Sequence, residues 1–400
     1  MFAGVRQRIA EVAAVAPPTY WYVWWGTLVN KLGGFVVPLL TIYLIKVRHV
    51  SVSEAGGVVS MFGAGSIAAS LVGGYLADRV GRKITLVVAL FGGALALTGL
   101  SFARDLTAIT VMVGVLGLVA EQYRPAVQAI VADVVPPAQQ VQAYGLLHWV
   151  INIGFAFAAI VGGLLAEVDF SILFVADAAT MAIYGVIVLV RVPETRPPVV
   201  ARAPGVHPSR PWFTDPEFVI FVAITFGIAL LPMQSIALSA HMTQQGFTPA
   251  AYGGVIAVNG VFVIALQPVL SAWAARRDAT RVLTVAALLY GAGFAMHGLA
   301  TSVVGHGVAV MVWTMGEIFE APTRSSIVAA LAPRDARGRY QGAVVMTFGA
   351  ANLVGPRLGT WTLQHQGPGA LWASCFVLGA VVALALLVTG PARRRRMAAP

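Results

Sequence analysis

Apolar runs of about 20 residues follow one another along almost the whole chain. A helix needs about 20 apolar residues to cross the roughly 30 Å hydrocarbon core of a bilayer. Backbone groups in that core must be satisfied within the segment, so each run is expected to be a helix. Only 10% of the 400 residues are charged, whereas soluble domains carry about a quarter. We therefore predict an all-α integral membrane protein.

Twelve of these runs are long enough to be predicted as transmembrane helices. An even number of spans places both termini on the same side of the membrane. The predicted spans are 20–45, 54–77, 84–103, 107–132, 141–166, 171–191, 217–240, 250–274, 281–301, 306–330, 339–364 and 369–390.

The basic residues are distributed unevenly between the two sides of this topology. Of the 26 Lys and Arg residues, 19 lie on the side of the termini, three lie in the opposite loops and four lie inside the runs. Cytoplasmic loops carry the excess of Lys and Arg in membrane proteins. Both termini are therefore predicted to be cytoplasmic, and the net charge of +10 needs no nucleic acid partner. Residues 1–16 are expected to form an interfacial helix, and Arg393 to Arg396 are expected to contact lipid headgroups.

A polar segment rich in Pro and Arg divides the chain near its middle. This predicted linker, 192–215, separates an N-terminal bundle, 1–191, from a C-terminal bundle, 216–400. The halves also share a pattern, since the spacing of Pro125 and Pro136 recurs in Pro322 and Pro333. Two bundles related by an axis along the membrane normal are a known transporter plan. We predict two pseudo-symmetric six-helix bundles, and such a pair suffices for a monomer.

The stretch GGYLADRVGRK, residues 73–83, places one acid and three bases in the tight loop between spans 2 and 3. It resembles the signature loop of the major facilitator superfamily, G-x-L-a-D-R-x-G-R-K. The resemblance implies the fold of that superfamily, with twelve helices, and a gating loop that stabilises one transport state. The residues that would take this role are Gly73, Asp78, Arg79, Gly81, Arg82 and Lys83. The second half has a degraded copy, SAWAARRDATR, in which Arg276 replaces the acid.

Two further stretches resemble bacterial drug:proton antiporters with twelve spans. They are TLVNKLGGFVVPLLTIYL in span 1 and EQYRPAVQAIVADVVPP in span 4. The resemblance implies efflux from the cytoplasm across the inner (plasma) membrane of a bacterium. These exporters carry a Gly-Pro motif in span 5, where this chain has Ala158-Ala159 instead. The departure leaves open an uptake symporter or uniporter for a sugar, peptide or organic anion. A receptor or assembly factor on the same fold, without transport, is a second alternative.

Ionisable residues inside the predicted spans are the main candidates for function, because each costs about 2.5–3.5 kcal/mol at a helix centre. Desolvation raises the pKa of a carboxylate, and a nearby Arg or Lys lowers it. An acid that alternates between wet and sealed surroundings can therefore carry a proton. The candidates for proton coupling and substrate contact are Lys31, Glu121, Arg124, Glu317, Glu320 and Arg324.

The spacing of these residues leaves a structural alternative open. Glu121 with Arg124, and Glu320 with Arg324, are helix neighbours that can neutralise each other. Glu317 has no base at i+4 and is the stronger proton candidate. Lys31 either pairs with an acid of span 4 or 10 or contacts an anionic group of the substrate.

Weaker candidates are the other polar residues within the spans, which can also bond between helices. They are Asn30, Asn152, Asp177, Gln234 and Asn259. The sequence has no nucleotide-binding loop and no nucleophile elbow, so it is not expected to be an enzyme. Its histidines lack metal-ligand spacing, so neither a metal nor a cofactor is expected. The sequence thus predicts a secondary transporter that exports small hydrophobic or amphiphilic compounds of the multidrug type, in exchange for protons, by alternating access.

Overall fold

The structure is a computed structural model that describes residues 12, 14–136, 139–196, 211–274, 276–333 and 337–398. The side chains of Leu71, Gly74, Asp78, Val141, Pro268, Arg337, Gly338 and Ala398 are also outside the description. Within these ranges every regular element is a helix. Most of the predicted interfacial helix at 1–16 and the middle of the predicted linker lie outside the described residues.

The chain divides into two compact units. Unit 1 comprises Met1–Leu40 and Met61–Val200, and unit 2 comprises Thr41–Ser60 and Ala201–Pro400. Residues 41–60 group with unit 2 through contacts near the start of α4 (Val52–Arg79). There the Ser60 hydroxyl accepts from the Arg357 N–H at 3.1 Å, and the Gln364 amide oxygen accepts from the Ser53 N–H at 2.7 Å.

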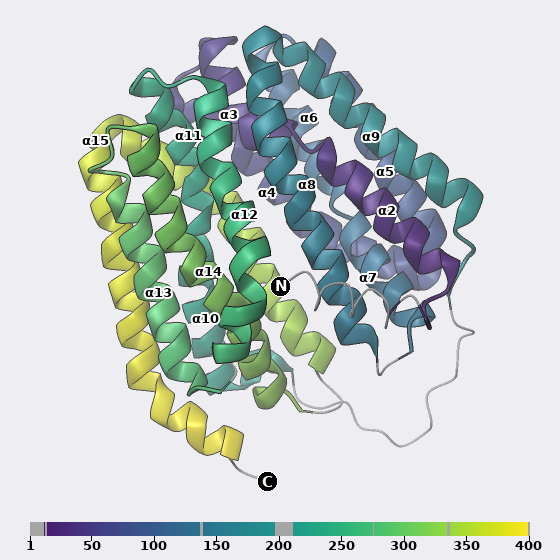
Figure 1. The fold of residues 1–400 in the computed structure, drawn as a ribbon, viewed down its shortest axis with the longest axis vertical. Helices are drawn as coiled ribbons and strands as arrows, with labels where there is room; N and C mark the ends of the chain where they lie inside the picture. The colour runs from purple at the N-terminus through teal and green to yellow at the C-terminus, as the bar shows by residue number, and fades with distance from the viewer. Residues whose placement is uncertain are drawn as a thin grey trace. The chain divides into compact units, whose positions relative to one another are not determined.

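Apart from residues 41–60, unit 1 is built from the helices that correspond to the first six predicted spans (Figure 1). The helix α2 packs against α8 and α9, and α5 packs against α6, α7 and α9. The bounds are α2 (Pro18–Leu32), α3 (Val36–Lys46), α4 as above, α5 (Arg82–Phe102), α6 (Leu106–Ala120), α7 (Tyr123–Val134), α8 (Gln140–Val168) and α9 (Phe170–Arg191).

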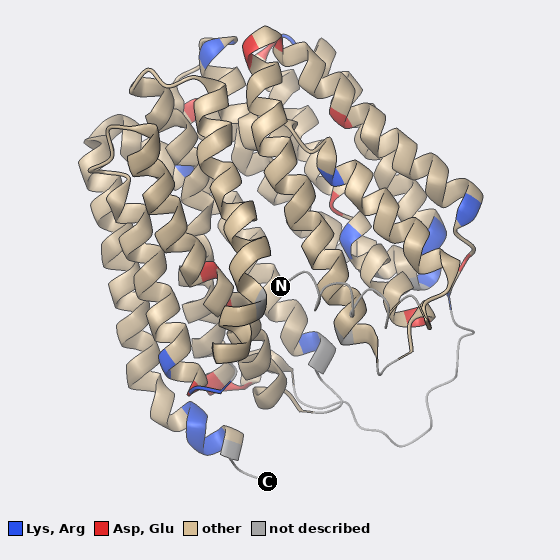
Figure 2. Ribbon diagram, viewed as in Figure 1, with Lys and Arg blue, Asp and Glu red and all other residues tan. Residues whose placement is uncertain are grey.

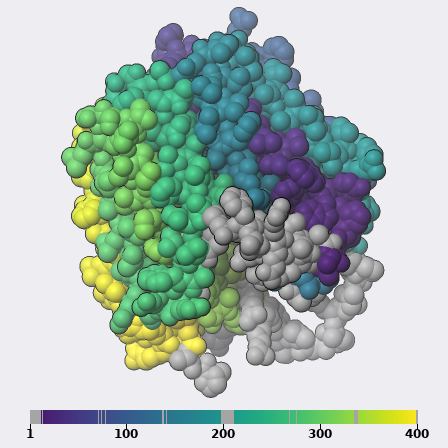
Figure 3. Space-filling view, viewed as in Figure 1, coloured from purple at the N-terminus to yellow at the C-terminus, as the bar shows by residue number. Residues whose placement is uncertain are grey.

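Unit 2 follows with a second set of helices, of which α13, α14 and α15 run side by side (Figure 1). On the face drawn in Figure 3, side chains close the spaces between its green and yellow helices. The bounds are η2 (Trp212–Thr214), α10 (Pro216–Leu230), η3 (Pro232–Gln234), α11 (Ser235–Gln244), α12 (Pro249–Ala274), α13 (Ala279–Met296), α14 (Val303–Leu331) and α15 (Arg337–Ala398).

Ten helical stretches of the described chain are long and apolar enough to cross a membrane. Two differences separate this number from the twelve predicted spans. Spans 11 and 12 lie within the single element α15, which Gly367 interrupts with a φ of 84°. The helix α14 covers span 10 with 29 residues but is not among the ten. Its middle carries Glu317, Glu320 and Arg324, which lower its apolar character. The count of twelve stays a prediction.

Three predicted spans are broken in the middle. Span 1 is interrupted after Leu32 by a Gly-Gly pair. Span 4 is interrupted at Glu121 and Gln122, and span 7 at Pro232. A proline lacks the N–H that a continuous helix requires, which explains the third break. Such breaks free backbone groups inside a bundle, where side chains can meet them.

Small residues bring the helices of each unit close together. A side chain at Gly291 of α13 would approach the Cα of Gly379 in α15 at 3.0 Å. A side chain at Gly117 of α6 would overlap the backbone of Phe62 in α4. Close approach through small residues is the usual way that helices associate in membranes. The charged residues are sparse along the helices and gather towards their ends (Figure 2).

Candidate functional site

Glu317 lies on α14 of unit 2 beside an amide from α12. The Asn259 side chain donates to the Glu317 carboxylate at 2.6 Å and to the Thr314 hydroxyl at 3.1 Å. Within the described part of the chain, no Lys, Arg or His nitrogen lies within 4.0 Å of Glu317. The structure therefore joins a main candidate with a weaker one, and leaves the carboxylate without a basic partner.

Glu320 and Arg324 form an ion pair one turn further along α14. The Arg324 Nε lies 2.5 Å from the Glu320 carboxylate, and the side chains are only 15% and 4% exposed. The guanidinium also lies 4.7 Å from the centroid of the Phe348 ring on α15. The pairing that the sequence spacing allows is thus formed, and it is buried.

Glu121 and Arg124 form the corresponding pair in unit 1, at 2.5 Å. Here the Arg124 side chain is 60% exposed and the Glu121 side chain 18%. Glu121 occupies the position that ends α6, and Arg124 lies in the first turn of α7. An acid at a helix C-terminus and a base at an N-terminus both oppose the helix dipoles. Their mutual pairing offsets that cost.

Lys31 lies in the last turn of α2, directly before the break in span 1. Its ammonium is 4.8 Å from the centroid of the Tyr123 ring. No acidic oxygen of a described residue lies within 4.0 Å of it, so the predicted pairing with an acid is absent there. A cation–π contact is worth about 0.5–2 kcal/mol, and a helix C-terminus adds about 0.3–1 kcal/mol. At typical values these offset only part of the roughly 2.5–3.5 kcal/mol that a central Lys costs.

Asp177 meets the other side of the same break. Its carboxylate accepts from the backbone N–H of Val36, the first residue of α3, at 3.3 Å. Asp177 comes from α9 and is 7% exposed. An acid at a helix N-terminus is favourable. The structure therefore gives Asp177 a specific role at the start of the second half of span 1.

The remaining weaker candidates mostly bond to nearby backbone. Asn30 is buried beside Lys31 on α2. The Asn152 amide donates to the carbonyl of His148 at 2.9 Å. Gln234 donates to Leu230 and to Gly355, which links the break in span 7 to α15.

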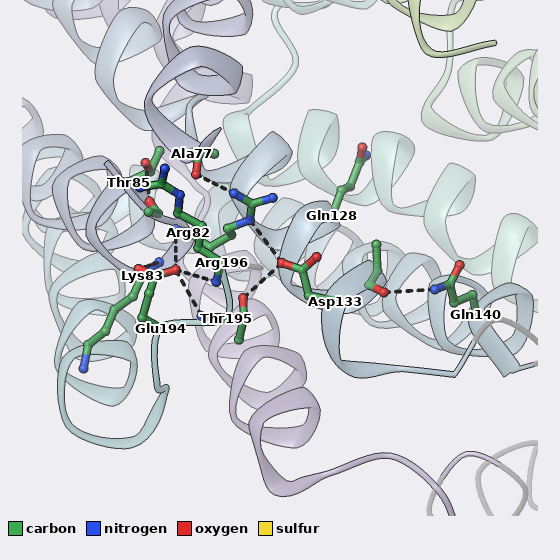
Figure 4. Close-up of polar contacts among 12 residues, drawn as sticks. Ala77, Arg82, Lys83, Thr85, Gln128, Asp133, Gln140, Glu194, Thr195 and Arg196 are labelled. Carbon is green, nitrogen blue, oxygen red and sulfur yellow. Dashed lines mark hydrogen bonds and ion pairs between the residues drawn. The ribbon is translucent and has the colours of Figure 1, made fainter. Parts of the chain in front are cut away.

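The loop between α4 and α5 is held by an acid that follows α9 (Figure 4). The Glu194 carboxylate accepts from the backbone N–H of Arg82 at 2.8 Å and of Lys83 at 3.2 Å. The Arg82 side chain pairs with Asp133 at 3.0 Å and donates to the carbonyl of Ala77. We call Arg82, Asp133 and Glu194 the latch of unit 1. It cross-links the ends of α4, α5, α7 and α9.

The predicted gating residues contribute to this loop in different ways. Gly81 has a φ of 130°, and a side chain there would overlap the Glu194 carboxylate. Gly73 packs against Gln122 of the break in span 4, and the Arg79 carbonyl accepts from Arg196. The side chain of Asp78 lies outside the described residues. The sequence interpretation missed Glu194 and Asp133, although an acid directly after span 6 was a visible signal.

In the equivalent loop of unit 2 the signs of the charges are reversed, because the loop supplies the acid and the distant partner is a base. Asp278 accepts from the Arg281 N–H at 2.9 Å and so begins α13 from within its own loop. Its long-range partner is a base, Arg394, at 3.4 Å.

The C-terminal arginines depart from the expected headgroup contact. Arg393 is 3% exposed and donates to Thr280 and to the carbonyl of Leu386. Arg396 binds Asp215 through two 2.6 Å hydrogen bonds. Burial opposes ionisation of Asp215, but hydrogen bonds from Arg396, Tyr340 and the Phe218 N–H hold the pKa of Asp215 below its usual range. The prediction was wrong for Arg393 and Arg396 because acids and carbonyls of the same chain lie within their reach.

Two histidines that the sequence showed as scattered are brought together in unit 2. The Nδ1 atoms of His297 and His306 lie 2.9 Å apart, and His306 also bonds Gln245 at 2.9 Å. Among the described residues, no three His, Cys, Asp or Glu side chains are placed to hold a metal ion.

The matches to known proteins extend over nearly the whole chain. The family model described as Major Facilitator Superfamily matches residues 23–346 and 233–399. The chain is 25% identical to the uncharacterized MFS-type transporter YqjV of Bacillus subtilis (strain 168), over 88% of each chain. It is 24% identical to a Na(+), Li(+), K(+)/H(+) antiporter of Planococcus maritimus, over 80% of this chain and 84% of the relative. It is also 24% identical to the multidrug resistance protein MdtH of Enterobacter sp. (strain 638), over 89% and 90%.

Solved structures agree on the fold. A crystal structure of the peptide transporter POT in complex with sulfate superposes with a TM-score of 0.80. The match covers 98% of this chain and 99% of that one, at 15% sequence identity.

Proposed function

Because the chain belongs to the Major Facilitator Superfamily, we propose that this multi-pass membrane transporter exports small amphiphilic compounds in exchange for protons, with Glu317 as the proton carrier. The observation that carries this proposal is the lack of a basic partner at Glu317. Of the three acids considered, Glu121 and Glu320 each bind an arginine at 2.5 Å. Among the described residues, Glu317 is bound only by the neutral amide of Asn259.

A carboxylate held by an amide can lose its charge without leaving a buried cation behind. If Glu320 takes up a proton, Arg324 is left as an unpaired charge with an exposed fraction of 15%, which is costly. If Glu317 takes up a proton, Asn259 can rotate its amide and present its oxygen instead. Protonation of Glu317 therefore costs less than protonation of Glu320, the other acid on α14.

One relative supports exchange with protons, and a different relative supports export. The printed name of one relative includes a proton antiporter, and another is named as a multidrug resistance protein. In the proposed cycle, Glu317 binds a proton when the site faces outside and releases it when the site faces the cytoplasm. Substrate would bind in the deprotonated state and leave on the outer side. We place the protein in a bacterial plasma membrane as a monomer with both termini in the cytoplasm.

Transport assays in proteoliposomes test this proposal. The full chain is reconstituted with an acidic interior and an internal pH dye, and amphiphilic dyes and drugs are added outside. Antiport predicts that a substrate triggers loss of protons from the vesicles. Glu317→Gln is expected to lower this flux by about tenfold or more. Glu121→Gln is the matched control, because Arg124 of its pair is 60% exposed, and it is expected to retain the flux.

Other outcomes identify the alternatives. Accumulation of substrate with protons moving in the same direction would indicate an uptake symporter and contradict export. Unchanged flux in Glu317→Gln would contradict the assignment of the proton carrier. No flux with any compound would favour the receptor without transport.

A further inference from the structure

Lys31 is a cation within a predicted span of unit 1 that forms no ion pair with the described residues. An ammonium carries three N–H donors and no acceptor. In the part of the chain that the structure describes, these donors meet no carboxylate within 4.0 Å. Their single described contact is the face of the Tyr123 ring.

The nearby acids are already engaged. Glu121 binds Arg124, and the carboxylate of Asp177 binds the N–H of Val36 at the start of α3. Moving either acid to Lys31 would leave a cation or a helix N-terminus without its partner. Asp177 also interacts electrostatically with Lys31, but from beyond the 4.0 Å of an ion pair. An anionic group of a ligand can therefore still contact the ammonium directly.

The surroundings hold Lys31 in place. Gly154 of α8 packs directly on the start of its side chain, so that any larger residue at 154 would overlap the Lys31 Cβ. The Tyr123 ring belongs to the first residue of α7. Lys31 is thus fixed by three helices, α2, α7 and α8, while it retains intermediate exposure. A positioned and reachable ammonium suits an amphiphilic ligand with an anionic group.

We propose that Lys31 binds the anionic group of the transported compound, so that the substrates are aromatic or amphiphilic carboxylates. The proposal rests on the proposed export function, but binding can be tested apart from transport. Lys31 would supply the charge, and the buried Tyr123 ring, which is 6% exposed, would hold the ammonium in position. Arg124 lies 5.9 Å from the same ring but is neutralised by Glu121.

Equilibrium binding to the purified full-length protein tests this assignment. The probes are 1-naphthoate, its methyl ester and 1-naphthylmethylammonium, which share one ring system and differ in charge. The wild type is expected to bind the carboxylate at least tenfold more tightly than the ester or the cation. Lys31→Gln is expected to remove that preference, and Lys31→Arg to retain most of it.

Two controls separate loss of a ligand contact from damage to the fold. Lys46→Gln makes the same chemical change in the last turn of α3, where the side chain is exposed, and is expected to change nothing. Binding of the methyl ester to Lys31→Gln should equal that of the wild type. Equal affinity of the wild type for carboxylate and ester, or an equal loss of both in Lys31→Gln, would overturn the proposal. So would the absence of carboxylate binding to the wild type.

Transport distinguishes the two proposals from each other. Selective carboxylate binding with no proton-linked flux would overturn export and leave Lys31 as the anion site. Proton-linked flux of esters and carboxylates alike, unchanged in Lys31→Gln, would overturn the Lys31 assignment and leave export in place.

Discussion

The two units carry the same kind of ion pair in different surroundings. Glu320 and Arg324 lie inside the continuous helix α14, with side chains 4% and 15% exposed. Glu121 and Arg124 lie at the break between α6 and α7, and Arg124 is 60% exposed. A third pair, Asp215 with Arg396, lies between these extremes at 12% and 31%.

The charge left outside the pairs also differs between the units. Among the six main candidates, the one without an ion pair to a described residue is a cation, Lys31, in unit 1 and an acid, Glu317, in unit 2. The spacing of i, i+3 and i, i+4 explains which charges neutralise each other. Ion pairing is therefore a structural role that both units share. The unpaired charge differs in sign between the units, so each unit can take part in different chemistry.

Removal of the base from the buried pair is expected to have the largest effect. Arg324→Met leaves Glu320 buried without its partner, which typically costs about 3–5 kcal/mol. Thermal unfolding in detergent should show a large drop. The double variant Arg324→Met/Glu320→Gln should recover most of it. A single variant as stable as the wild type would show that the pair is not buried as described.

Disruption of the latch is expected to cause the next largest loss of stability. It extends the comparison of the two units to their loops. Glu194→Ala removes a charged acceptor from two backbone N–H groups of α5 and is expected to cost about 1–3 kcal/mol. In unit 2 the matched change, Asp278→Ala, removes a local cap and is expected to cost about 1 kcal/mol. Differential scanning of both variants gives the two values. If Asp278→Ala lost more stability than Glu194→Ala, the conclusion that the loop of unit 1 is the one that cross-links helices would be wrong.

The pair of intermediate exposure should give an intermediate loss. Arg396→Met removes two hydrogen bonds to Asp215, and we expect a loss of about 1–2 kcal/mol. The same unfolding assay measures it, with Arg395→Met as the control because Arg395 is exposed. If Arg396 instead contacted lipid, both variants would behave alike.

The pH dependence of this pair follows from the lowered pKa of Asp215. Since the folded pKa lies below the ordinary value of 3.8, the ionised carboxylate stabilises the fold at higher pH. That contribution is lost as the pH falls below 3.8 and through the folded pKa. The difference in unfolding temperature between the wild type and Asp215→Asn should therefore be constant from pH 7 to pH 5 and shrink in stronger acid. A difference that grows in acid would contradict the assignment.

The exposed pair should give the smallest loss. Arg124→Met is expected to cost about 0–1 kcal/mol, as exposed ion pairs usually do. Comparison with Arg324→Met under the same conditions isolates the effect of burial. Equal losses in the two variants would remove the distinction between the units.

The sequence predicted what depends on local pattern. Apolar length gave helices in the expected places, and helix spacing gave both ion pairs on spans 4 and 10. The signature loop and the family model agree on the superfamily. These features need only residues within a few turns of each other.

Contacts between segments that are distant in the chain could not be predicted from local sequence pattern. Glu194 is 112 residues from Arg82 in the chain, and Asp177 is 141 residues from Val36. Neither partner can be chosen until the helices are packed. The break in span 1 has the same cause, because a Gly-Gly pair permits a break but the acid at the start of α3 comes from another helix. Arg393 and Arg396 were assigned to lipid because their partners in unit 2 were unknown.

Proton release on substrate binding tests the role of Glu317 most directly. The purified protein is placed in weakly buffered detergent with a pH indicator, and a transported compound is added. The wild type and Glu121→Gln are expected to release protons, whereas Glu317→Gln should release none while it still binds the compound. Undiminished proton release from Glu317→Gln would contradict the account.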